Sequence, residues 1–275
     1  MKDMHYVLEN FFTHKDYLVP GSQIPGTLFT PLHFLFAAAL FTLIFSSAFY
    51  VSRHRKLLKP VLASVWAVMV VWEFGIIYWD SVAGKVIGLD LQTNLSLYPC
   101  SLYLYTMPFV LWGKGKIKQA CCGYICTLGL LGAMINLIFP LTRLYDYSCI
   151  SFAGMHTFCF HGSMLLTFLV LVLSDYHRYD CVTTWQGLLL PCIPSLILSV
   201  PANLVNYAIG SDYMFFTGQF PVVARIFGHT RPVLITMTMY LLYILMPALF
   251  YLRGYMKNRH AEEEDALVLL ATDFS

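Results

Sequence analysis

Three side chains that can do chemistry lie inside long apolar stretches: the carboxyl of Glu73, the thiol of Cys100 and the imidazole of His161. An ionisable group costs about 2.5–3.5 kcal/mol at the centre of a bilayer, so it persists where it faces a bundle interior and has partners. A thiol is nucleophilic as the thiolate, which needs a base. His161 can accept the proton and Glu73 can orient the imidazole. Because acyl esters are the natural electrophiles among lipids, these residues predict acyl transfer through a cysteine thioester.

Further polar residues follow in the last two apolar stretches. Asn203, Asn206 and His229 can donate hydrogen bonds to a developing oxyanion, and Arg231 would cover the site together with His229. These four are the candidate substrate-binding residues. A plainer interpretation of the asparagines stays open, because they are three residues apart, share a helix face and can bond to a neighbouring helix.

Plainer interpretations also stay open for the titratable groups. Glu73 can be protonated and bonded to another helix, and His161 can be a satisfied interior histidine. His156 lies five residues before His161, about 140° away around a helix, so we expect the two imidazoles not to face the same site. A metal site built from Cys159 and these histidines lacks a ligand spacing, and nucleotide-binding motifs are absent, so we expect no metal and no cofactor.

The composition indicates which elements must hold these residues. Apolar residues make up 58% of the 275 and charged residues only 12%, against about 45–50% and 25% in soluble domains. That excludes a disordered chain and nearly excludes a water-soluble one. The net charge of +2 is too small to suggest nucleic acid as a partner.

Charged residues are confined to short intervals. Six runs without Asp, Glu, Lys or Arg are each at least 21 residues long, and a seventh apolar run contains only Glu73. Runs of about 18 residues or more are candidate membrane helices. The pattern therefore predicts an all-α, polytopic integral membrane protein with a seven-helix bundle. The predicted spans are 31–51, 61–79, 94–112, 120–139, 152–173, 185–208 and 232–252.

Basic residues predict the orientation of this bundle. Eleven of the 17 Lys and Arg residues fall on one side of the seven spans and six on the other. By the positive-inside rule the N-terminus lies outside and the C-terminus in the cytoplasm. Residues 1–260 then form one transmembrane domain, and 261–275 form a short acidic cytoplasmic tail. In this topology Glu73, Cys100, His161 and Asn203 lie six to nine residues from the outer ends of their spans, a shared depth of about 9–14 Å.

Several short motifs resemble the YwaF-like family of integral membrane proteins, which is related to transmembrane protein 164 of animals. They are 71–75 (VWEFG), 98–100 (YPC), 160–162 (FHG), 206–207 (NY), 210–214 (GSDYM) and 228–229 (GH). The animal relative is described as a cysteine-dependent acyltransferase that moves fatty acyl chains between phospholipids. The resemblance implies that Cys100 is the nucleophile, that His161 is its partner, and that Glu73 matches the relative's glutamate.

The sequence thus predicts a multi-pass protein of the cell membrane whose partners are membrane lipids and whose function is lipid acyl transfer. Cys100 would attack the ester, His161 would act as base and then acid, and Glu73 would orient His161. The alternative is a non-enzymatic transporter or receptor-like bundle whose polar layer binds a small molecule or an ion.

Overall fold

All regular secondary structure is helical in the computed structural model, which describes residues 2–19, 23–139, 145–219, 221–228 and 231–273. The helices differ widely in length, from single turns to one of 42 residues. In chain order they are α1 (Lys2–Glu9), η1 (Lys15–Tyr17), α2 (Pro31–Arg53), α3 (Arg55–Ala83), α4 (Leu102–Trp112), α5 (Gly115–Tyr124), η3 (Ile125–Gly129), α6 (Leu130–Ile138), α7 (Phe152–Leu173), α8 (Trp185–Leu189), η4 (Leu190–Cys192), α9 (Ile193–Ile209), η5 (Tyr213–Phe215), α10 (Pro221–Phe227) and α11 (Pro232–Asp273).

Six helical stretches of the described chain are long and apolar enough to cross a membrane. Four are the single helices α2, α3, α7 and α11, and two are composite. Of the composite ones, α5, η3 and α6 form Gly115–Ile138, and α8, η4 and α9 form Trp185–Ile209. The short apolar helix α4 is the remaining predicted span. The prediction of an all-α, polytopic membrane protein is therefore confirmed, while its orientation in the membrane stays a prediction.

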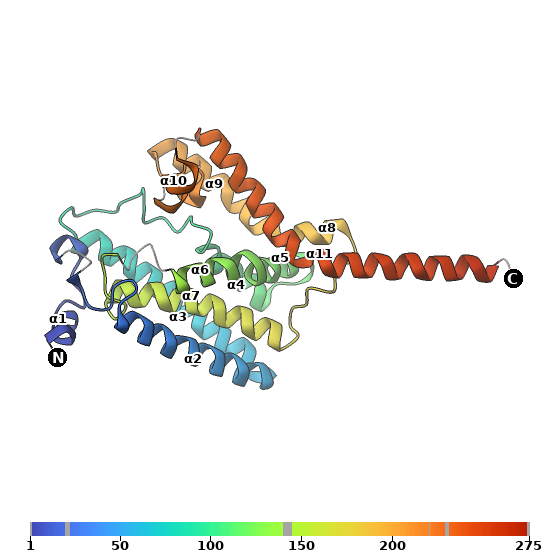
Figure 1. Ribbon diagram of the computed structural model, residues 1–275, viewed down its shortest axis with the longest axis horizontal. Helices are drawn as coiled ribbons and strands as arrows, with labels where there is room; N and C mark the ends of the chain where they lie inside the picture. The colour runs from blue at the N-terminus through green and yellow to red at the C-terminus, as the bar shows by residue number, and fades with distance from the viewer. Residues whose placement is uncertain (1, 20–22, 140–144, 220, 229–230, 274–275) are drawn as a thin grey trace.

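Helix α7 forms the interior of one half of the molecule, where it packs on α2, α3 and α6 (Figure 1). In its span 67% of the residues are buried, against 17% in α2 and in α3. Polar side chains on α7 are therefore enclosed by protein, whereas α2 and α3 leave many side chains exposed on the outside of the molecule.

Local sequence signals explain where several helices begin and end. Thr30 caps α2 through its hydroxyl, which accepts from the His33 N–H, and Pro31 follows at a position where its missing N–H costs nothing. Ser151 caps α7 in the same way, accepting from the Gly154 N–H at 3.2 Å. Gly210 ends α9 with φ of +70°, a left-handed conformation that glycine adopts without strain.

The predicted span 94–112 is only partly helical. Helix α4 begins at Leu102, and residues 84–101 form turns and irregular backbone. Pro99 explains the late start, because it has no N–H to donate and disfavours helical backbone at the residue before it. With 11 residues α4 spans about 16 Å, near half of the hydrocarbon core. Cys100 therefore precedes its helix instead of lying inside it.

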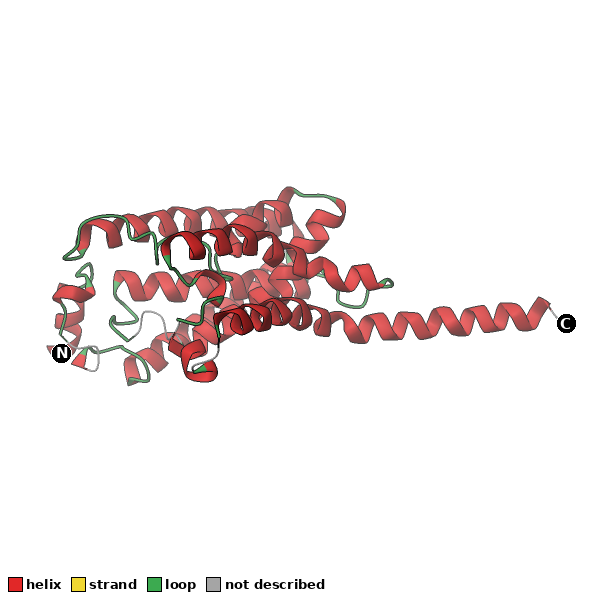
Figure 2. Cartoon of the chain, turned by 90° about the horizontal axis from the view of Figure 1, so that it is seen from above, coloured by secondary structure: helices red, strands yellow, loops and turns green. Residues whose placement is uncertain are grey.

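The last helix is much longer than the predicted span 232–252. Helix α11 continues without interruption to Asp273, so the acidic residues Glu262–Glu264 belong to a helix rather than to a separate tail segment. Figures 1 and 2 both show its C-terminal half projecting beyond the other helices. The predicted boundary at residue 260 thus falls within a continuous helix.

Candidate functional site

The thiol of Cys100 lies at the N-terminal end of α4. Successive turns lead into the helix, with the Ser101 N–H bonded to the Tyr98 carbonyl and the Tyr103 N–H bonded to the Cys100 carbonyl, both at 3.0 Å. Cys100 is half-buried and packs against the main apolar core. The free N–H groups and the dipole at a helix N-terminus interact favourably with negative charge, whereas the burial of Cys100 and the nearby Glu73 carboxylate disfavour a thiolate, so the thiol needs a base.

Two tyrosines from other elements hold the segment that precedes Cys100. The Tyr213 hydroxyl donates to the Leu91 carbonyl at 2.7 Å and accepts from the Leu95 N–H at 2.9 Å. Burial raises the pKa of Tyr213, which keeps this hydroxyl protonated. The fully buried Tyr124 donates to the Pro99 carbonyl, next to Cys100. The backbone around the thiol is therefore fixed from two sides.

A π-helical turn directly follows Tyr124. The stretch that carries Tyr124 changes from α-helix to the π-helix η3 directly after it, at Ile125–Gly129. Single π turns inside α-helices are frequent at functional sites because they shift the register of the residues around them. The sequence offered no signal for this irregularity.

The carboxyl of Glu73 joins three parts of the fold. The Ser96 hydroxyl donates to Oε1 at 2.7 Å, and His156 Nε2 lies 3.1 Å from Oε2. The imidazole is not aligned for a hydrogen bond, so the second contact is a close electrostatic one. Because Ser96 lies four residues before Cys100, the carboxyl links α3 and α7 to the segment that carries the thiol. Its predicted orienting action on His161 stays a prediction.

His161 is buried in α7 with one ring nitrogen engaged. Its Nδ1 lies 2.8 Å from the Thr157 carbonyl, which can only accept, so Nδ1 carries the proton. The other nitrogen, Nε2, is then an unprotonated acceptor, and it is buried with no hydrogen-bond partner among the residues described. An imidazole in this state can take a proton from a thiol.

Helices α4 and α7 touch through the Tyr103 side chain. The Tyr103 and Phe160 rings lie 6.0 Å apart at a steep angle, and the Tyr103 hydroxyl is 3.2 Å from Thr167 Oγ1. Tyr103 follows Cys100 by three residues and Phe160 directly precedes His161. The neighbours of both predicted catalytic residues are thus in contact, while the pairing of thiol and imidazole itself stays a prediction.

Both asparagines of α9 form hydrogen bonds within the protein. The Asn203 amide donates to the Ser199 carbonyl at 3.0 Å and to the Tyr240 hydroxyl of α11 at 2.8 Å. Asn206 is buried; its Nδ2 donates to the Tyr213 carbonyl, and its Oδ1 accepts from the Tyr213 N–H and the Ser211 hydroxyl, all at 2.8 Å. The interhelical role left open for Asn203 is therefore present, and Asn206 closes the turn after α9. Their substrate-binding role stays a prediction.

Of the two residues expected to cover the site, Arg231 is exposed directly before α11, and its carbonyl accepts from the Leu234 N–H at 2.9 Å. His229 lies outside the described residues. Their part in substrate binding stays a prediction as well.

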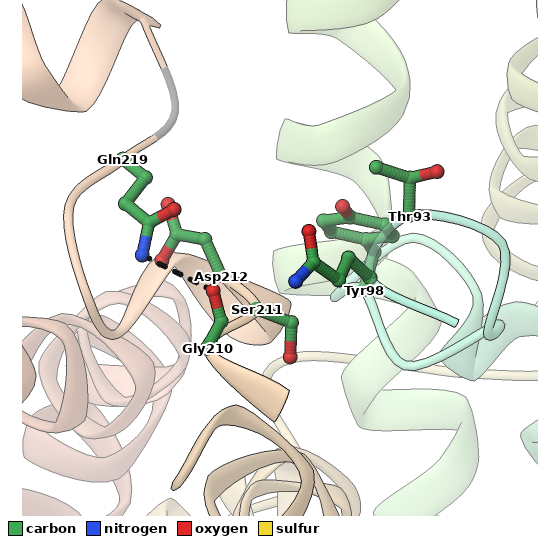
Figure 3. Close-up of a pocket in the computed structure, with 7 residues that line it drawn as sticks. Thr93, Tyr98, Gly210, Ser211, Asp212 and Gln219 are labelled. Carbon is green, nitrogen blue, oxygen red and sulfur yellow. Dashed lines mark hydrogen bonds between the residues drawn. The ribbon is translucent and has the colours of Figure 1, made fainter. Parts of the chain in front are cut away.

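A small polar pocket of about 190 Å³ opens beside the Cys100 segment. Figure 3 shows Thr93 and Tyr98 on one side and the residues after α9 on the other, where Gln219 donates to the Gly210 carbonyl at 3.4 Å. The wall also includes Asp212, whose Oδ1 accepts from the Thr217 N–H and hydroxyl at 2.8 Å. Tyr98 is two residues before Cys100, so the pocket offers amides, hydroxyls and a carboxyl close to the candidate nucleophile.

The comparison with protein families decides the relationship of this chain. Residues 28–253 match the model of the TMEM164 family. The chain belongs to that family. The matched region contains Glu73, Cys100 and His161. This confirms the relation to transmembrane protein 164 expected from the motifs. No curated protein and no solved structure matches this member of the TMEM164 family.

Glu73, Ser96 and His156 form a polar cluster in this TMEM164-family protein. Two of its members, His156 and Ser96, were not predicted as site residues. The angle of about 140° between His156 and His161 on α7 predicts that they do not face the same site, and His156 contacts Glu73 from its own face of the helix. Its depth was a usable signal, since His156 lies four residues into α7 and so near the same outer layer as Glu73. Ser96 gave no signal, because it was assigned to a helix that begins only at Leu102.

Proposed function

We propose that this TMEM164-family membrane protein is a lipid acyltransferase that carries a fatty acyl group as a thioester on Cys100. The observation that carries the proposal is the state of His161: its Nδ1 is committed to the Thr157 carbonyl and its buried Nε2 is free to accept a proton. A base enclosed by apolar residues, on a helix that contacts Tyr103 of α4, suits a reaction on lipid esters and not on water-soluble substrates.

The reaction would proceed in two balanced half-reactions. His161 Nε2 accepts the thiol proton while the Cys100 sulfur attacks the ester carbonyl of a donor lipid. The ester C–O bond breaks, the imidazolium protonates the departing alkoxide, and a lysolipid leaves. The hydroxyl of an acceptor lysolipid then attacks the thioester, His161 removes its proton, the C–S bond breaks, and the sulfur takes the proton back.

The surroundings support this assignment in three ways. The dipole at the N-terminus of α4 offsets part of the cost of forming a buried Cys100 thiolate. Glu73 ties the segment before the thiol to α7 through Ser96 and His156. The polar pocket beside Tyr98 can hold the glycerol and head group of a lipid, with the exposed Arg231 available to a phosphate.

The test is acyl exchange by purified protein in liposomes that contain a labelled donor phospholipid and an unlabelled lysophospholipid. We expect Cys100→Ala to abolish transfer and to remove a hydroxylamine-sensitive acyl label from the protein. Cys159→Ala is the matched control, because Cys159 is also half-buried but lies on α7 away from the α4 terminus. Equal transfer by wild type and Cys100→Ala would refute the proposal.

A further inference from the structure

An apolar groove follows the exposed side of α3 and ends at the first residue of α7. Its volume is about 550 Å³, and its wall is almost entirely apolar. The lining residues are Ala67, Val68, Val71, Trp72, Gly75 and Phe152. No described residue of the chain fills the groove.

The groove lies on the membrane-facing part of a span. Residues 68, 71, 72 and 75 recur at intervals of three and four and so share one face of α3. Val68 and Val71 are 55% and 72% exposed, in a helix apolar enough to cross the bilayer. A Cβ added to Gly75 would meet no atom within 4 Å, so the glycine leaves this part of the groove open. In a bilayer, lipid chains are the molecules that reach this surface.

The inner wall distinguishes the groove from an ordinary lipid-facing surface. The indole Nε1–H of Trp72 is buried and has no acceptor among the residues that the structure describes. The same indole ring lies 5.9 Å from the His156 ring, edge to face, and His156 contacts Glu73. Trp72 therefore forms part of the groove wall, its unsatisfied N–H lies buried behind that wall, and its ring borders the polar cluster of the candidate site.

We propose that the groove binds one acyl chain of a bilayer phospholipid, and that the Trp72 indole turns its buried N–H toward the ester carbonyl of that chain. A phospholipid has the two features that the groove requires, a long apolar chain and a carbonyl oxygen at its polar end. The inference rests on the proposed function in one respect: the bound chain is that of the acyl donor.

Binding is tested directly with a phospholipid that carries a photoreactive diazirine on its acyl chain, in liposomes with the full-length protein. We expect labels on residues 67–75 to exceed by about tenfold those on the exposed side of α2, where Phe34, Leu35 and Leu43 face lipid. Gly75→Leu fills the groove and should bring labelling of 67–75 down to the α2 level. The matched control is Gly132→Leu on α6, where an added Cβ also meets nothing within 4 Å. Leucine is a better helix former than glycine, so neither change is expected to disrupt folding.

The proposal that the groove binds an acyl chain would be refuted by equal labelling of α2 and α3. It would also be refuted if Gly75→Leu left the labelling of residues 67–75 unchanged. A kinetic measurement then connects the groove to the reaction: Gly75→Leu should lower transfer from a palmitoyl donor about tenfold, and transfer from a butyryl donor by a much smaller factor. Trp72→Phe keeps an aromatic side chain but removes the indole N–H, and should weaken labelling of residues 67–75 by the diazirine phospholipid. If the wild-type protein transfers no acyl group, the proposed function fails, and the photolabelling still decides whether the groove binds a chain.

Discussion

Replacing Asn206 by alanine tests whether this side chain stabilises the folded protein or binds the substrate. The variant loses three hydrogen bonds of 2.8 Å from a residue that is 6% exposed. At about 1 kcal/mol of net stability for each bond, the expected loss is about 3 kcal/mol. For a domain of this size each kcal/mol shifts the midpoint by about 2–4 °C, so we expect the Tm to fall by about 6–12 °C.

Thermal unfolding of the detergent-solubilised protein can be followed with a dye that fluoresces on reaction with thiols. The chain suits this assay because five of its eight cysteines are buried and two more are half-buried. Asn136→Ala is the control, since the Asn136 amide makes a single bond, to the Gly132 carbonyl at 3.0 Å. It should cost about 1 kcal/mol and shift the Tm by about 2–4 °C.

The same change should also affect the candidate site. Asn206 holds Tyr213, and Tyr213 bonds to Leu91 and Leu95 in the segment that leads to Cys100. Transfer should therefore decline well below the new Tm. If Asn206→Ala melts with the wild-type protein and only its apparent affinity for lipid is reduced, the structural assignment is wrong and the side chain is a substrate ligand.

Two further predictions concern histidines. His161→Gln should abolish acyl transfer with little change in Tm, whereas His156→Gln should lower the Tm by removing the contact with Glu73 and should retain part of the activity; full activity of His161→Gln would exclude it as the base. His177, in the loop after α7, has its pKa lowered from 6.5 to about 4 by burial, so the unfolded chain binds more protons between these values. Its contribution to stability is complete above pH 6.5 and is lost as the pH falls through 4, by about 3 kcal/mol. Melting curves at pH 7 and pH 4 measure this loss, and an equal loss in His177→Gln would show that another group is responsible.

Much of the helical architecture could be predicted because the bilayer imposes a simple rule on the chain. The prediction 152–173 coincides with α7, where Ser151 supplies a cap and charged residues bound the apolar run. The prediction 94–112 was wrong at its start, because hydropathy cannot distinguish an apolar helix from apolar irregular backbone. Pro99 was correctly treated as a residue that disturbs a helix, but its effect is to delay the helix rather than to bend it.

The sequence predicted which residue types belong to the candidate site more readily than which of these residues contact one another. The cost of burying a carboxyl predicted that Glu73 would have partners, and it contacts Ser96 and His156. The identity of those partners was not predictable, because it depends on how α3 and α7 are rotated about their axes, and packing between helices sets those rotations. Several polar residues were predicted to lie at a similar depth in the membrane, but a similar depth does not determine which of them are in contact.

The amino-acid sequence by itself determined that this is a helical membrane protein of the TMEM164 family and which ionisable residues lie within its spans. The free energy of transfer from water to the bilayer is approximately a sum over the residues of a segment. Each apolar segment can therefore be recognised from its own residues, without knowledge of the others. Only the tertiary structure decided that Cys100 begins a helix, that Glu73 meets His156, and that Trp72, in the wall of a groove beside Gly75, borders the polar cluster. Those features depend on the mutual packing of distant segments, which no single segment encodes.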